Sequence, residues 1–511
     1  MVKLLMGDTR YMFRQHMRLL HPTRIFLVVA CLSYIATLPG KCESQSGSEP
    51  ARLTPFDSQP WLADFHQLIE AMDSHYSDLE WAVNDRRMDL PKLRQQTEEK
   101  LRESGDNQSA RRTLEQFLNA FGDGHLSIEW AQNDVSSHQL ESGAVEPLCS
   151  RLGYKTSSKA GIDFSLLPGF AVVPGEGAEL FSGGLLTLHG GKKLGLIRIA
   201  SFNEHGFPME CSNTIREMHL SDASACDRDC AKTIALKTAN SLTEAIVNRA
   251  EQLRSLGASA LLIDVTRNDG GDDWNEAVAR SLSSIPLVDE RIGFIRYPTW
   301  TTNLESRLND LESDLDKGAA PRSVLEEAAH KLRLAIAQSK EPCDRSRVFE
   351  DGSLNCSLVV KNILFWSGVL PYAKPGSFAS LESKTTLFSP LRYEYTENAH
   401  RLPLYVAVDR HSWSSAERFA ALLQDDGAAT IIGELTGGAG CGFMNGGIPT
   451  TLTHSRARVK IPDCVGFRKD GSNANDGVTP DILVPWAARD TPYTKANKLL
   501  LYLEKVPLRS E

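Results

Sequence analysis

Several features of specialised protein classes are missing from this sequence. No stretch gathers Lys and Arg on the scale of a nucleic-acid-binding surface, and acidic side chains outnumber basic ones by 65 to 56. The cysteines show no paired C-x-x-C spacing combined with histidines, which argues against a zinc site. Internal repeats and long low-complexity tracts are also absent. What remains is the composition of an ordinary globular protein, for which we expect no nucleic-acid partner and no metal or organic cofactor.

The only long apolar run lies near the N-terminus. Residues 25–38 (IFLVVACLSYIATL) follow a segment with several arginines and end at Pro39. A basic segment, a short apolar stretch and a break are typical of an export signal. We therefore expect residues 1–41 to be a signal peptide and the protein to be periplasmic or extracellular. An uncleaved anchor, which would hold the protein close to a membrane, is the alternative.

The use of cysteine agrees with export. From Cys149 onward the chain carries an even number of cysteines, and disulfides persist in oxidising compartments. Proximity in the sequence suggests that Cys343 pairs with Cys356 and that Cys441 pairs with Cys464. Many other pairings fit the same spacing, so the connectivity stays open at this level.

The first third of the chain predicts a helical domain. After a polar linker at 42–60, apolar residues recur at three- and four-residue steps, as on one face of an amphipathic helix. They are Trp61, Leu62, Phe65, Leu68, Ile69 and Met72, and later Leu114, Phe117, Leu118 and Phe121. We expect an N-terminal helical domain over 55–130, then a connecting region of strands and loops over 131–190.

The remainder of the chain predicts an α/β core over 191–490. Short apolar runs with branched residues at 194–202, 260–265, 404–409 and 429–434 are typical of buried strands. Helical patterns at 234–256, 274–282 and 414–423 lie between them. This alternation favours a mostly parallel sheet. Residues 303–338 are expected to form an inserted helical hairpin, and 491–511 a C-terminal tail.

Two of the predicted strands end in loops that could carry chemistry. The first leads from Asp409 to a helix that begins near Ser414, so the Ser414 hydroxyl would lie at the edge of the sheet. Taken alone, such a serine is usually an ordinary helix cap. The second strand ends in Gly270-Gly271, where backbone N–H groups can approach a ligand closely. Side by side, these loops can supply a nucleophile and an oxyanion hole.

These segments resemble the peptidase family that includes C-terminal processing (tail-specific) proteases, the tricorn core protease and the interphotoreceptor retinoid-binding protein. The matching motifs follow one another in the family's order. They are D-G-H at 123–125, D-V-T-R-N-D-G-G at 264–271, S-S-A-E at 414–417, Q-D-D-G-A-A at 424–429, G-E-L-T at 433–436 and G-V-T-P-D at 477–481. The resemblance implies a ClpP/crotonase-like α/β core. The short interval between Trp130 and Leu194 implies that no complete PDZ domain is present.

The resemblance also assigns roles to single residues. Ser414 would be the nucleophile, and the N–H groups of Ser415 and of Gly270 or Gly271 would bind the oxyanion. Tail-specific proteases use a lysine as the base, but Ala439 occupies that position here. The tricorn-like branch uses a histidine, which His125 matches. Imidazole suits this task because its pKa lies near neutrality.

The acid that would orient the histidine departs from the family pattern. Tricorn-like members have a glutamate three residues before the glycine of G-V-x-P-D, and this chain has Ala474 there. Asp476 is the expected substitute, with Asn473 as the alternative. Loss of an orienting acid lowers the rate without abolishing the chemistry.

We therefore expect a serine endopeptidase that cleaves polypeptides outside the cytoplasm through Ser414 and His125. A binding protein on the same scaffold, holding a peptide or hydrophobic ligand with little or no cleavage, is the first alternative. An envelope interaction module that uses the insertion at 303–338 is the second. The sequence indicates no oligomeric state.

Overall fold

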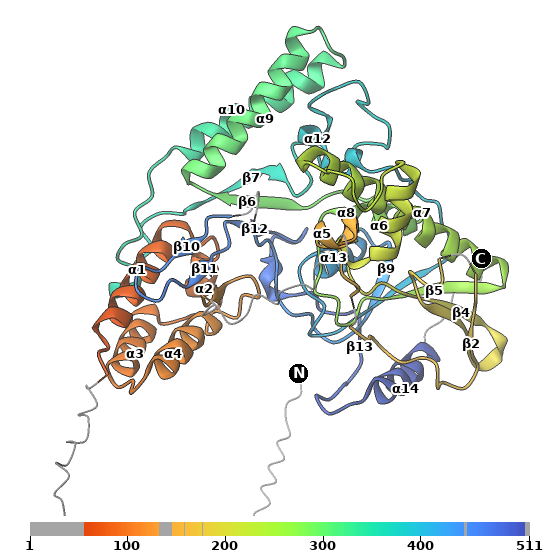
Figure 1. Cartoon of the computed structure of the whole chain (residues 1–511), viewed down its shortest axis with the longest axis horizontal. Coiled ribbons are helices and arrows are strands. Elements are labelled where there is room, and N and C mark those ends of the chain that lie inside the picture. The colour runs from red at the N-terminus through yellow and green to blue at the C-terminus, as the bar shows by residue number, and fades with distance from the viewer. Residues whose placement is uncertain (1–55, 132–145, 158, 176, 444–446, 506–511) are drawn as a thin grey trace, which may run out of the picture. The chain divides into compact units, whose positions relative to one another are not determined.

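The computed structural model describes residues 56–131, 146–157, 159–175, 177–443 and 447–505 (Figure 1). The predicted signal peptide and most of the predicted linker lie outside these ranges. Within them, no helix is both long enough and apolar enough to cross a membrane.

A seven-stranded sheet forms the centre of the α/β core, in the order β13-β9-β8-β5-β4-β3-β2. The five strands from β13 to β4 are parallel, and β3 and β2 continue the sheet in antiparallel fashion. The strands are β2 (Phe170–Val172), β3 (Gly183–Thr187), β4 (Lys193–Arg198), β5 (Ala258–Asp264), β8 (Leu404–Val408), β9 (Ala429–Gly433) and β13 (Ile482–Leu483). The predicted mostly parallel α/β core is confirmed.

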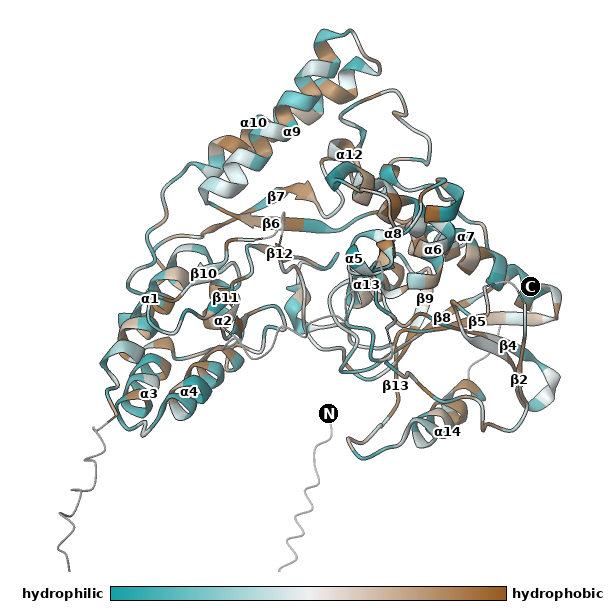
Figure 2. Cartoon of the chain, in the orientation of Figure 1, coloured by the Kyte–Doolittle hydropathy of each residue, from teal (hydrophilic) through white to brown (hydrophobic). Residues whose placement is uncertain are grey.

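Helices cover both faces of this sheet, whose central strands are hydrophobic along most of their length (Figure 2). Leu261 and Ile263 point to the layer of α7 (Arg228–Ser255), α8 (Trp274–Leu282) and α13 (Ser415–Asp425). The alternate residues Ala260 and Leu262 point to the other face, against α14 (Pro492–Leu503). A strand that is buried on both faces is apolar at nearly every position, and the sequences of the central strands show this pattern.

The N-terminal residues form a separate hydrophobic core of helices. These are α1 (Gln59–His75), α2 (Leu79–Asn84), α3 (Leu90–Arg102) and α4 (Asn107–Asn119). Leu452, Val459 and Ile461, from near the end of the chain, pack into the same core. Strand β1 (Ser127–Glu129) pairs with β11 (Arg458–Lys460), which pairs with β10 (Thr450–Thr451). The core of α1 to α4, which we call the helical layer, is therefore completed by a segment from near the end of the chain. No local sequence pattern predicts this long-range pairing.

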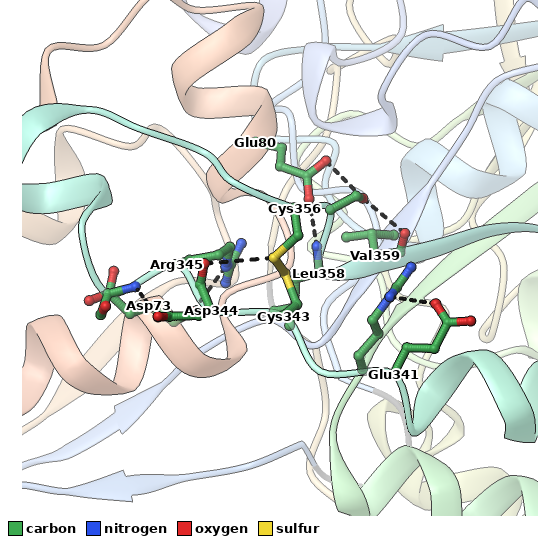
Figure 3. The surroundings of a disulfide bond; sticks show 12 residues. Asp73, Glu80, Glu341, Cys343, Asp344, Arg345, Cys356, Leu358 and Val359 are labelled. Carbon is green, nitrogen blue, oxygen red and sulfur yellow. Dashed lines mark hydrogen bonds and ion pairs between the residues drawn. A yellow bond between two sulfur atoms is a disulfide. The ribbon is translucent and has the colours of Figure 1, made fainter.

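A disulfide-closed segment also ties the helical layer to the rest of the molecule (Figure 3). Cys343 and Cys356 are joined, as expected from their spacing. Within the loop they close, the buried Arg345 guanidinium donates to the main-chain oxygens of Asp73 and Tyr76 at 2.9 and 3.1 Å. Beyond it, the Leu358 N–H donates to the Glu80 carboxylate at 2.8 Å.

The predicted insertion is a helical hairpin of α9 (Pro298–Asp316) and α10 (Arg322–Ser339), which lie side by side (Figure 1). It follows β6 (Arg291–Ile295), the middle strand of a small antiparallel sheet with β7 (Val359–Phe365) and β12 (Cys464–Gly466). This sheet was not predicted from the sequence, because its strands come from three distant segments.

The remaining elements are short. They are the helices α5 (Leu148–Arg151), α6 (Pro208–Glu217), α11 (Val348–Asp351) and α12 (Lys384–Leu387), and 3-10 turns at His189–Gly191, Glu204–Gly206, Ser389–Arg392 and Ala474–Asp476. Disulfides join Cys149 to Cys211, Cys226 to Cys230, and Cys441 to Cys464. The last of these is the second pair that the sequence suggested.

Candidate active site

Two loops meet at the carboxyl ends of the parallel strands β5 and β8. The Arg267 N–H donates to the Asp409 carboxylate at 2.8 Å. The Trp413 N–H donates to the Asn268 main-chain oxygen at 2.9 Å. These bonds hold the loop after β5 against the loop after β8. The expected juxtaposition follows from topology, since neighbouring parallel strands end at the same edge of a sheet.

Ser414 lies at the turn between β8 and α13 in a strained backbone conformation, with φ of 53° and ψ of −121°. Positive φ is uncommon for a residue with a side chain and persists only where the surroundings enforce it. Here the Ser414 N–H donates to the Glu417 carboxylate at 3.0 Å. The turn presents the Ser414 hydroxyl at the helix N-terminus with partial access to solvent.

Glu417 organises the loop that faces the serine. Its buried carboxylate also accepts hydrogen bonds from the Thr436 hydroxyl, the Gly438 N–H (2.8 Å) and the Ala439 N–H (2.7 Å). Burial raises the pKa of Glu417, and these hydrogen bonds oppose that rise. One side chain thus fixes both the turn at Ser414 and the loop at 436–439.

Gly270, of the glycine pair, approaches Ser414 as the sequence suggested. Gly270 has a φ of 90°, and a Cβ atom there would lie 2.6 Å from the Ser415 nitrogen and 2.8 Å from the Ser414 Cβ. Only glycine fits this contact. The Gly270 N–H donates to the Asn268 side chain at 2.8 Å, whereas the Gly271 N–H has no acceptor among the described residues. Of the two alternatives, Gly271 is therefore the one whose N–H has no hydrogen bond in the described part of the chain.

His125 lies opposite Ser414, with 3.2 Å between its Nε2 atom and the Ser414 Oγ atom. The turn that carries it packs at Gly124 against Ala439 and Trp413. The Gly442 backbone lies against the imidazole ring, leaving no room for a Cβ atom, and Phe443 contacts the ring edge-on. The structure thus brings together two residues that lie 289 positions apart in the sequence.

The other imidazole nitrogen has no such partner. Nδ1 of His125 is buried and unpaired within the described part of the chain. The structure does not bring Asp476 to it, because the Asp476 carboxylate accepts the Trp81 indole N–H at 2.9 Å. The Asn473 side chain donates to Asp78 at 2.8 Å. Burial lowers the pKa of His125, and the negative charge of Asp123 opposes that effect.

A small pocket, partly open to solvent, adjoins Ser414. Ala439 and Ala474, the two departures from the family pattern, both line it, together with the aromatic rings of Trp366 and Phe467. Its other lining residues are Glu290, Glu417, Arg418, Ala421, Gly440, Arg468 and Val478. The space is mostly apolar and lies directly beside the serine hydroxyl.

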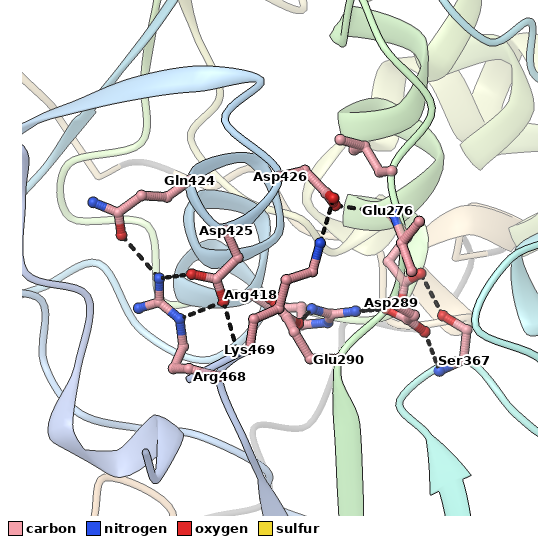
Figure 4. Close-up of polar contacts among 12 residues, drawn as sticks. Glu276, Asp289, Glu290, Ser367, Arg418, Gln424, Asp425, Asp426, Arg468 and Lys469 are labelled. Carbon is pink, nitrogen blue, oxygen red and sulfur yellow. Dashed lines mark hydrogen bonds and ion pairs between the residues drawn. The ribbon is translucent and has the colours of Figure 1, made fainter. Parts of the chain in front are cut away.

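A buried ionic cluster packs against α13 (Figure 4). Arg418 forms ion pairs with Glu276, Asp289 and Glu290. Burial raises the pKa of Asp289 well above its usual range and lowers the pKa of Arg418 to about 10. Arg468 and Lys469 pair with Asp425 and Asp426 at the end of the same helix. These contacts fix the helix whose first turn carries Ser414.

Sequence reasoning missed several residues around the serine. Trp413, Trp366 and Phe467 shape the surroundings of Ser414, and only Trp413 lies next to it in the sequence. Tyr76 and Asn475 contact Asp123, beside His125, from distant segments. Asp123 belongs to the D-G-H motif, but the motif alone assigned a role only to His125. In the ranges that the structure covers, no group of His, Cys, Asp and Glu is arranged to hold a metal ion.

Comparison with known proteins decides the family. The model of peptidase family S41 matches residues 193–484, more than half of the chain. The chain belongs to peptidase family S41. This assignment bears out the resemblance drawn from the motifs and makes the protein a member of a family of serine peptidases.

Individual relatives of this S41 protein are distant. A curated protein of Chlamydia pneumoniae is 32% identical over 120 residues, which is 22% of this chain and 18% of that relative. Crystal structures of mature CPAF, free and complexed with lactacystin, superpose with TM-scores of 0.50 and 0.51 at 16% identity. These superpositions cover 88% of this chain and 97–98% of the CPAF chains, and they support the fold.

Proposed function

We propose that this S41 protein is a serine endopeptidase in which Ser414 is the nucleophile and His125 is the general base. The observation that carries the proposal is the 3.2 Å approach of His125 Nε2 to Ser414 Oγ at a strained strand-to-helix turn. Hydrogen-bond contact between nucleophile and base is the first requirement for activating a serine.

The chemistry follows from these positions. His125 removes the proton of the Ser414 hydroxyl as Oγ attacks the substrate carbonyl carbon. The N–H groups of Gly271 and Ser415 stabilise the oxyanion that forms. His125 then returns the proton to the leaving amine, and an acyl-enzyme remains on Ser414. A water molecule then attacks the acyl-enzyme while His125 removes its proton. His125 returns that proton to Ser414 Oγ, and the carboxylic acid product is released.

The pocket beside Ser414 is the proposed binding site for the substrate side chain that precedes the cleaved bond. Its aromatic and alanine lining favours an apolar side chain, because burial of apolar surface is favourable. A peptidase substrate is a polypeptide, and exposed or unfolded segments would reach this site most readily. No cofactor takes part in the proposed reaction.

We further propose that the enzyme works in the periplasm or outside the cell. The basic and apolar N-terminal segment supports export, and the four disulfides among the described residues suit an oxidising compartment. Cell fractionation, with N-terminal sequencing of the protein recovered, tests this. Recovery from the cytoplasm with residues 1–41 attached would contradict it.

The central test is labelling with a fluorophosphonate probe, which reacts only with activated serines. The native protein should be labelled, Ser414→Ala should not be, and His125→Ala should be labelled at least about a hundredfold more slowly. His66→Ala, at an exposed position in the helical layer, serves as the matched control and should react at the native rate. Failure of the folded native protein to react would favour a binding protein that holds peptides or hydrophobic ligands, a function consistent with the unpaired Nδ1 of His125.

A further inference from the structure

The base of the proposed reaction lacks the usual carboxylate partner at its second nitrogen. His125 becomes an imidazolium during the reaction, and a buried cation needs a nearby negative charge. Ala474 carries none, Nδ1 has no partner in the described structure, and Asp476 is bonded to Trp81 instead. The compensating charge must therefore come from another side of the ring.

Asp123 is the acidic side chain beside His125. It is only 6% exposed, and its Oδ1 atom accepts the His125 main-chain N–H at 2.9 Å. Its Oδ2 atom accepts the Tyr76 hydroxyl at 3.1 Å and the Asn475 amide at 3.4 Å. Asn475 also accepts the Gly440 N–H at 2.6 Å. One carboxylate thus joins the base-bearing turn to the helical layer and, through Asn475, to the loop that follows Ala439.

We propose that Asp123 is the positioning acid of this site, which fixes the turn carrying His125 and supplies the negative charge that stabilises the His125 imidazolium. The proposal rests on the proposed function, because it assigns the acid to the same nucleophile and base. The carboxylate acts on the histidine through its backbone and through space, and not through a bond to Nδ1.

A second buried carboxyl decides whether Asp123 is ionised. Asp78 is 1% exposed and is bonded to Ser77 and Asn473. Burial, and then the charge of Asp123, raises the pKa of Asp78 to about 8. Burial also raises the pKa of Asp123, but the nearby His125 and three hydrogen bonds oppose this rise. The two buried carboxyls disfavour each other's ionisation, and the proposal requires that the charge resides on Asp123 and the proton on Asp78.

The other charged groups around this pair do not replace Asp123. The Arg86 guanidinium donates to the Phe121 main-chain oxygen and acts electrostatically on Tyr76. Lys361 acts on Asp78 from the side of β7. Burial holds the pKa of Tyr76 well above its ordinary value, so Tyr76 stays neutral and donates its hydroxyl proton to Asp123.

The test compares Asp123→Asn with Asp78→Asn in the full chain. Asparagine keeps the shape of each side chain and removes its ability to carry charge. The rate constant for fluorophosphonate labelling would be measured between about pH 5 and 9. For Asp123→Asn we expect a plateau about tenfold lower and an acid limb displaced by about one pH unit toward lower pH, since the imidazolium loses its counter-charge. Asp78→Asn should stay within about twofold of the native profile, because Asp78 is already neutral at pH 7.

Two results would overturn the proposal. One is a folded Asp123→Asn protein with the native pH profile, which would leave Asp123 a purely structural role. The other is a displaced profile for Asp476→Asn, which would return the orienting role to Asp476. Absence of labelling in the native protein would instead count against the proposed function.

A second measurement tests the proposal even if the Asp123→Asn variant does not fold. Carboxyl carbon NMR of the native protein, with labelled aspartate, should show one buried aspartate that keeps its proton up to about pH 8 and disappears in Asp78→Asn. The Asp123 carboxyl should be ionised at pH 7. A protonated Asp123 at that pH would contradict the proposal directly.

Discussion

The backbone N–H of Ala439 donates a 2.7 Å hydrogen bond to the Glu417 carboxylate. Ala439 stands where tail-specific relatives place the lysine base, and its side chain contributes only a methyl group to the pocket beside Ser414. The main chain at this position therefore helps to hold the loop that faces Ser414, although the side chain offers no base.

Glu417→Gln should disrupt both the fold near Ser414 and the proposed reactivity. Glutamine cannot accept all the hydrogen bonds that the carboxylate receives, so buried donors lose their acceptor. We expect a loss of about 2–4 kcal/mol in the free energy of unfolding and slower fluorophosphonate labelling. Glu434→Gln is the control, because its ion pair with Arg410 lies at the surface and contributes less than about 1 kcal/mol. Equal effects of the two changes would refute the prediction.

Gly270→Ala should lower labelling by about a hundredfold or more. The added methyl group would collide with the Ser415 nitrogen and the Ser414 Cβ, displacing the oxyanion donors. Gly427→Ala is the matched control. Its φ is also positive, at 69°, but no atom lies within 4 Å of the added Cβ. It should cost only about 1 kcal/mol of stability and leave labelling intact, and a comparable loss of labelling would attribute the Gly270 effect to backbone strain alone.

Removal of the Cys441–Cys464 disulfide should affect reactivity more than removal of Cys343–Cys356. Cys441 immediately precedes Gly442, whose backbone packs on the His125 ring. The double serine variant should lose about 3 kcal/mol of stability and most of its labelling. The Cys343/Cys356 double variant should lose similar stability yet label normally, as determined at a temperature where both remain folded. Normal labelling without Cys441–Cys464 would show that the loop needs no cross-link.

His400→Gln should reduce the loss of stability at acid pH. Burial lowers the pKa of His400 from 6.5 to about 4. Between these values the unfolded chain binds a proton that the folded protein does not, so stability falls as the pH falls. The native protein should lose about 2 kcal/mol more than His400→Gln between pH 7 and 5. Urea denaturation at both values measures this, with exposed His411→Gln as control. Identical pH dependence of the native protein and His400→Gln would contradict it.

The fold was predictable wherever the signal was local. Continuous apolar runs marked β4, β5, β8 and β9, because buried parallel strands need no polar face. The apolar residues at three- and four-residue steps from Trp61 to Met72 predicted α1, because one face of that helix is buried. The small sheet of β6, β7 and β12 escaped prediction, since each strand gains its partners only after distant parts of the chain have met.

The site was predictable to the extent that motifs carry it. Ser414 and the glycine pair lie together because their loops follow neighbouring parallel strands, and His125 lies against Ser414 from the turn after α4. The partner of His125 could not be read in the same way. Asp476 lies close to the expected position in the sequence, but its carboxylate accepts the indole N–H of Trp81, which belongs to the helical layer. The position of that indole depends on tertiary packing that no spacing rule encodes.

The placement of His125 in the helical layer, 289 residues before Ser414, also bears on the biosynthesis of this protein. The layer is completed by residues 452–461, which lie beyond the nucleophile. A nascent chain therefore carries the proposed base, His125, long before Ser414, and the two meet only when almost the whole polypeptide has been made and folded. Unfinished or truncated products would lack the approach of His125 to Ser414 on which the proposed reaction depends.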